Sequence, residues 1–174
     1  MAKRFEPDRP ASRRCGKSLI LGGPLVLAFA GLQVFPARSI GIPIEVIGTN
    51  PPERLNVDAP PKVAAILRRS CFDCHSNETR WPFYTRIAPA SWLMAYDVYN
   101  AREQVNFSTW GDEGADERQD DKRDCWDQIE ANHMPRWYYV YPFHLRARLS
   151  NSDKAALKSW LLSIYRARPP AEME

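Results

Sequence analysis

The sequence lacks the motifs of several large enzyme classes. Only eight glycines occur among its 174 residues, and none belongs to a phosphate-binding loop or a nucleophile elbow, which excludes the usual nucleotide-binding and α/β-hydrolase sites. Four cysteines occur, but Cys15 lies in the basic N-terminal flank, Cys71 and Cys74 belong to one short motif, and Cys125 is left alone, so no disulfide framework can be built. No internal repeat is present, so a solenoid or propeller fold is excluded.

The domain that follows residue 35 also lacks an excess of charge of either sign. Residues 1–35 carry six Lys/Arg and two Asp/Glu, a net charge of +4, whereas the whole chain has a net charge of +3. The rest of the chain is therefore near neutral, at net −1. Because its basicity is confined to the N-terminal end, the sequence gives no indication of nucleic-acid binding.

Residues 18–35 form an uncharged, largely apolar run behind a basic flank at 1–17. As a helix the run would be about 27 Å long, close to the hydrocarbon thickness of a bilayer, about 30 Å. The basic flank should stay in the cytoplasm, which places the rest of the chain outside. The run is either a transmembrane anchor in the inner membrane or a signal segment, cut near Ala30, that would release a soluble periplasmic protein.

The remaining sequence predicts a proline-rich stalk over 36–60 and one helical domain over 61–170. Fifteen prolines indicate short elements with stiff connections. Ser150 and Asp153 approximate a capping box at the start of the last helix, and Pro169-Pro170 ends it. Apolar residues recur at helical spacing, and no segment reads as a central strand, so we expect an all-α fold. The other predicted helices cover 61–69, 90–105 and 115–132.

The segment Cys71-Phe72-Asp73-Cys74-His75 carries the most specific signal, because C-x-x-C-H is the c-type haem attachment signature. In one helical turn the two cysteines and the histidine share a face. Each thiol can then form a thioether with a haem vinyl group, and the imidazole can reach the iron as proximal ligand. Covalent haem attachment in bacteria occurs outside the cytoplasmic membrane, which agrees with export of the domain.

Two other chemistries use the same residue types. A zinc site would need a second ligand pair, and Cys125 with His133 does not have a zinc-binding spacing. A thioredoxin-like dithiol would need a βαβ unit around the motif, which the sequence does not contain. Arg68 and Arg69, just before the motif, are either solvated or in reach of a haem propionate.

The run from Cys71 to Trp110 resembles the bacterial haem-binding domain of small, membrane-anchored c-type proteins. The stretches NPP at 50–52, HMPRWYY at 133–139 and LSNSDKAALKSW at 149–160 share this resemblance. The resemblance implies one covalent haem c, a cytochrome-c-like fold and usually an uncleaved anchor. It implies attachment through Cys71 and Cys74, His75 as proximal iron ligand and Met134 as distal ligand. Arg136 is a departure, because the family more often has a second proline there.

The sequence itself favours Met134 as the distal ligand. A low-spin electron carrier needs a second axial ligand, and a methionine sulfur raises the haem potential. Met134 lies well after the motif, directly before Pro135. The other candidates are His133, His144 and Met94, the last of which lies among predicted core positions. An open or water-bound iron is the further alternative.

We therefore interpret the chain as a periplasmic one-electron carrier with His/Met-ligated iron and a redox partner protein. The near-neutral domain gives that partner no charge signature. A haem-based sensor with an open or displaceable distal position is the first alternative. A peroxidase-type enzyme, with His133 or His144 as acid–base group, is the second.

We expect residues 18–35 to be retained as a membrane anchor, because the run is uncharged, has a basic flank and follows the habit of the family it resembles. N-terminal sequencing of protein from native membranes should show a start upstream of this segment. A mature start at Gly31 would mean cleavage after Ala30 and would contradict the prediction.

Overall fold

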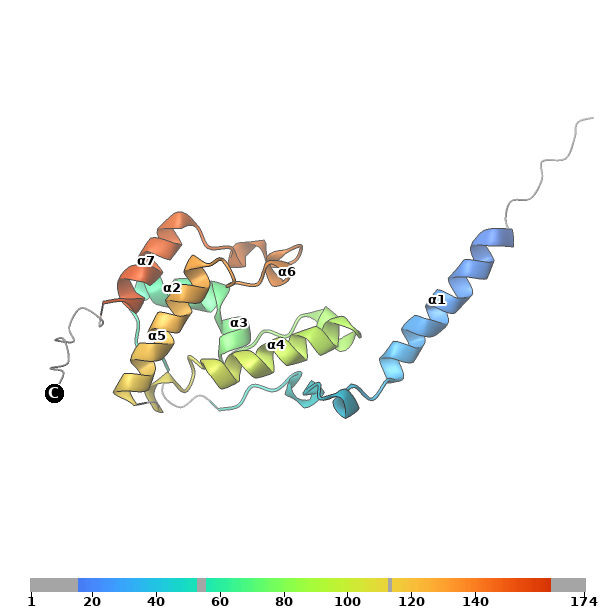
Figure 1. The fold of residues 1–174 in the computed structure, drawn as a ribbon, viewed down its shortest axis with the longest axis horizontal. Helices are drawn as coiled ribbons and strands as arrows, with labels where there is room; N and C mark the ends of the chain where they lie inside the picture. Colours follow the sequence, from blue (N-terminus) through green and yellow to red (C-terminus); the bar gives the residue numbers. More distant parts are fainter. Residues whose placement is uncertain (1–15, 53–55, 113, 164–174) are drawn as a thin grey trace, which may run out of the picture. The chain divides into compact units, whose positions relative to one another are not determined.

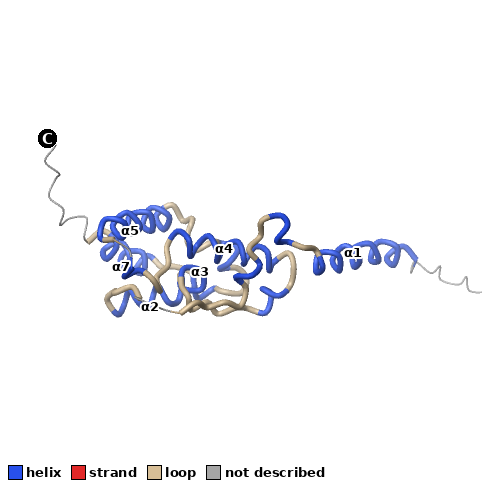
Figure 2. The backbone as a smooth tube through the Cα atoms, turned by 90° about the horizontal axis from the view of Figure 1, so that it is seen from below, coloured by secondary structure: helices blue, strands red, loops and turns tan. Residues whose placement is uncertain are grey.

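The computed structural model describes residues 16–52, 56–112 and 114–163 (Figure 1). The chain divides into two compact units, and the boundary in the sequence lies between Pro36 and Ala37. Within these ranges the chain forms seven α-helices and no strand, which confirms the all-α prediction (Figure 2).

The first unit contains helix α1, Gly16–Val34, with Pro24 inside it. Several of the side chains described in it are apolar and exposed, among them Leu25, Leu27 and Val34. Among the described residues, no helix is both long and apolar enough to cross a membrane. The membrane segment over 18–35 therefore stays a prediction, and residues 1–15 of the basic flank lie outside the described residues.

The second unit holds the remaining helices. The long ones agree closely with the predicted ranges, apart from the last helix, which ends at Leu161 rather than near Pro169; residues 164–174 lie outside the described residues. The helices are α2 Pro61–Ser70, α3 Phe72–His75, α4 Ala90–Gln104, α5 Ala115–Glu130, α6 Trp137–Val140 and α7 Asn151–Leu161. Short 3-10 turns lie at Ala37–Ile40, Ile44–Val46, Phe83–Arg86, Trp110–Asp112 and Leu145–Ala147.

The segment predicted as a stalk lies against the helical domain. Its 3-10 turn at Ile44–Val46 contacts α4. The backbone N–H of Val57 donates to the Phe107 carbonyl at 2.8 Å. The Asn50 side chain donates to the Thr79 carbonyl at 3.0 Å and accepts from the Thr79 N–H at 3.1 Å. These bonds satisfy polar groups of a segment whose described residues form no α-helix.

Helices α2, α5 and α7 pack together around the larger of two apolar clusters (Figures 1 and 2). This cluster contains Ile66, Leu67, Phe107, Trp126, Ile129, Leu157 and Trp160. The predicted capping box at Ser150 and Asp153 is present at the start of α7. Asp153 also accepts from Arg69 of α2 at 2.8 Å, so the cap joins the two helices.

Helix α4 belongs to the second cluster, which contains Met94, Val98, Tyr139, Val140 and Ala147. The single-turn helix α3 contacts both α2 and α4. Phe72 of α3 belongs to the larger cluster, and Cys74 packs against the second. The C-x-x-C-H motif therefore lies where the two clusters meet.

Candidate functional site

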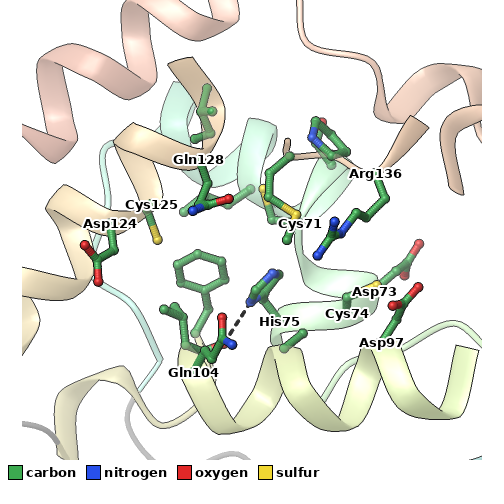
Figure 3. Close-up of a pocket in the computed structure, with 18 of the residues that line it drawn as sticks. Cys71, Asp73, Cys74, His75, Asp97, Gln104, Asp124, Cys125, Gln128 and Arg136 are labelled. Atoms are coloured by element: carbon green, nitrogen blue, oxygen red, sulfur yellow. Dashed lines mark hydrogen bonds between the residues drawn. The ribbon is translucent and has the colours of Figure 1, made fainter. Parts of the chain in front are cut away.

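Cys71, Cys74 and His75 stand on one helical turn, as the spacing predicts. Cys71 is both the C-cap residue of α2 and the N-cap residue of α3. Its carbonyl accepts from the His75 N–H at 2.9 Å and from the Cys74 N–H at 3.1 Å. This turn directs the two thiols and the imidazole into one cavity (Figure 3).

The cavity has a volume of about 440 Å³, which lies within the range of ligand-binding pockets. Its walls come from α2, α3, α4, α5, α7 and the loop between α5 and α6. Much of the lining is apolar and belongs to the larger cluster, including Leu67, Val105, Phe107, Ile129, Leu157 and Leu161.

His75 is oriented by a hydrogen bond at its Nδ1. Its Nδ1 lies 3.1 Å from the Val105 carbonyl oxygen. A carbonyl only accepts, so Nδ1 carries the proton and Nε2 keeps its lone pair. Burial lowers the pKa of His75, and the backbone hydrogen bonds to Val105 and Ala101 oppose that shift. A neutral imidazole oriented through its second nitrogen is the form that ligates iron.

The two motif cysteines are thiols rather than thiolates. Burial raises the pKa of both Cys71 and Cys74 to about 12. Redox-active cysteines have lowered pKa values, and zinc binds the thiolate form. The described residues contain no group of three or more His, Cys, Asp or Glu side chains that could hold a metal ion.

Met134 reaches the same cavity because of the way α5 ends. Asn132 adopts a left-handed conformation, with φ of 59°. The His133 N–H then donates to the Gln128 carbonyl at 2.9 Å, and the Asn132 N–H donates to the Ile129 carbonyl at 3.1 Å. This is the pattern of a Schellman motif. The Met134 N–H also donates to the Gln128 carbonyl, at 3.2 Å, and its side chain packs against the larger cluster.

The structure thus brings Cys71, Cys74, His75 and Met134 together and places the rival distal candidates elsewhere. Met94 is buried in the second cluster. His133 is exposed, and its Nδ1 lies 3.2 Å from Oε1 of Gln128. His144 lies beside Tyr84, with 2.7 Å between Nε2 and the hydroxyl oxygen.

The model of the haem-binding domain family matches residues 29–163. The chain belongs to this family. No curated protein and no solved structure shows significant similarity to the chain.

The cavity fits the haem that this family binds. A neutral imidazole with a free Nε2, a soft thioether sulfur and two thiols at attachment spacing all face one apolar space. Imidazole and thioether are both established axial ligands of haem iron, and apolar lining excludes water from it. The donor set therefore agrees with the family assignment.

The hydrogen bonds of Asp73 in the C-x-x-C-H motif were not predicted from the sequence. Asp73, between the two cysteines, is buried and accepts four hydrogen bonds. Arg80 supplies two from its guanidinium, both at 3.0 Å, and one from its backbone at 3.3 Å. The Tyr139 hydroxyl supplies the fourth at 2.6 Å. These hydrogen bonds hold α3 in place through Asp73, and the bond from Tyr139 connects α3 to α6.

The aromatic residues after the motif do not line this cavity. Trp81 and Tyr84 pack against the second cluster, and Phe83 is exposed. Trp81 and Tyr84 therefore contribute to the packing of the second cluster. The bond from Tyr139 to Asp73 could not be predicted from the sequence, because a tyrosine in an aromatic run gives no indication of which carboxylate its hydroxyl binds.

We expect Tyr139→Phe to lower the free energy of unfolding by about 2 kcal/mol, because it removes a hydrogen bond to a buried carboxylate. The ring, which stacks on His144, is retained. Urea unfolding measures the change. Tyr138→Phe is the matched control: its hydroxyl donates to the partly buried Asp97 at 3.2 Å, so its loss should be smaller. Equal losses of unfolding free energy in the two variants would contradict a larger contribution from the hydrogen bond to the buried Asp73.

Proposed function

We propose that the chain is a c-type electron carrier with one haem, attached through thioethers to Cys71 and Cys74. His75 would be the proximal iron ligand and Met134 the distal ligand. The observation that carries this proposal is that one apolar cavity holds all four side chains. The family assignment supports haem as the cofactor.

The haem would supply the one-electron chemistry, and the protein sets its conditions. His75 is oriented by its bond to Val105, so its Nε2 is available without a further change of protonation. Met134 provides a neutral, soft donor that favours ferrous iron. The apolar wall that includes Phe107 and Leu157 keeps water away from the metal.

We also propose that residues 18–35 hold the protein at the outer face of the cytoplasmic membrane. The uncharged length of residues 18–35 and the basic flank before it support this proposal. Periplasmic exposure would also place Cys71 and Cys74 where haem attachment takes place.

The first test is covalent attachment. Acid–acetone extraction of the purified protein should leave the haem with the polypeptide. Cys71→Ala with Cys74→Ala should release it, because both vinyl thioethers are then impossible. Cys125→Ala is the matched control, since Cys125 lines the same cavity but lies outside the motif. Haem that resists extraction from the double variant would refute thioether attachment at these positions.

The second test is the distal ligand. Met134→Ala should lose the weak sulfur-to-iron band at the red end of the ferric spectrum. It should also lower the midpoint potential and let carbon monoxide bind the ferrous form readily, because the soft axial donor is gone. Met94→Ala should cost only stability, about 2–5 kcal/mol, because Met94 lies in the second cluster.

Other outcomes of the second test identify other sites. A bis-histidine site would leave Met134→Ala unchanged and respond instead to substitution of His133 or His144. Immediate binding of carbon monoxide by the unmodified protein would mean an open iron position, and a sensor function would then replace electron transfer.

A further inference from the structure

The haem cavity has an unequal charge lining. Four of the residues that line it are acidic: Asp73, Asp97, Asp121 and Asp124. Among the described residues, Arg136 is the only Lys or Arg that lines it. Haem carries two propionate carboxylates, so a cavity whose charged lining residues are mainly acidic needs a cation where those groups lie.

Arg136 is held in place by the loop that also carries Met134. It is the N-cap residue of α6, and its carbonyl accepts from the N–H groups of Tyr139 and Val140, both at 3.1 Å. Figure 3 shows its side chain directed toward His75 and Cys74. Its charge contributes to the lowered pKa of His75, although burial is the main cause.

The acids of the cavity do not occupy Arg136. Asp73 is bound by Arg80 and Tyr139. Burial raises the pKa of Asp97, and its hydrogen bond from Tyr138 and the charge of Arg136 oppose that shift. Within the described ranges, no ion pair joins Arg136 to a carboxylate.

The arginines beside the motif are engaged elsewhere. Arg68 pairs with Glu78, and Arg69 pairs with Asp153. Neither lines the haem cavity; both line a separate one. Arg80 is bound to Asp73. Of the four arginines at 68, 69, 80 and 136, only Arg136 therefore remains available.

We infer that Arg136 binds a haem propionate. The inference rests on the proposed function only in requiring bound haem. A guanidinium matches a carboxylate with two parallel N–H donors, which an ammonium group cannot do. One short loop would then supply both the distal ligand and the propionate partner, and its positive charge would raise the reduction potential.

The test compares three variants of the full-length, haem-loaded protein: Arg136→Gln, Arg136→Lys and Arg86→Gln. Arg86 is exposed and lies outside the cavity, so it controls for loss of one positive charge. The readouts are the propionate bending band in the resonance Raman spectrum and the midpoint potential. The sulfur-to-iron band verifies that Met134 ligation is kept.

Arg136→Gln should shift the propionate band. It should also lower the equilibrium constant for haem reduction about tenfold, which is a fall of 59 mV in the midpoint potential for one electron. Arg136→Lys should keep most of the potential, because the charge remains, but still shift the band, because the planar fork is lost. Arg86→Gln should change neither readout.

An unshifted propionate band in both Arg136 variants would overturn the inference, even if the potential falls, because the charge would then act without binding the propionate. If Arg136→Gln does not retain haem, an unshifted band in Arg136→Lys alone overturns it. Release of haem from the unmodified protein by acid–acetone would refute covalent attachment but not this inference, which the band tests on any bound haem.

Discussion

The site depends on the way His75 is fixed from two sides. Its Nδ1–H donates to the Val105 carbonyl at 3.1 Å, and its own carbonyl accepts from the Phe107 N–H at 2.8 Å. Both partners belong to the segment that follows α4. Because Cys71 and Cys74 share the same helical turn, these two bonds also set where the thiols stand relative to α4.

Asp73 completes that arrangement on another side of the turn. A single-turn helix has little stability of its own, since nucleating a helix is costly. The bidentate bond from Arg80 and the bond from Tyr139 give α3 contacts that its length cannot supply. The same tyrosine joins the motif to α6, which begins directly after the loop that carries Met134 and Arg136.

Much of this protein was predicted by local sequence patterns. Apolar residues at helical spacing predicted α2, α4 and α5 to within two residues at each end, because that spacing depends only on residues three or four apart. The capping box at Ser150 was predicted because it depends on residues three apart. The C-x-x-C-H spacing placed two thiols and an imidazole on one face, because one helical turn fixes that geometry without any tertiary contact.

Tertiary structure decided what those side chains meet. The Val105 carbonyl that orients His75 is a backbone group thirty residues away, which no side-chain pattern marks. Asp73 looks like a surface acid in the sequence, yet Tyr139, sixty-six residues later, binds it in the interior. Arg136 looked like a simple departure from the family pattern. The end of α5 and the packing of α5 against α7 together bring its loop to the cavity, and contacts between such distant segments depend on how whole helices pack.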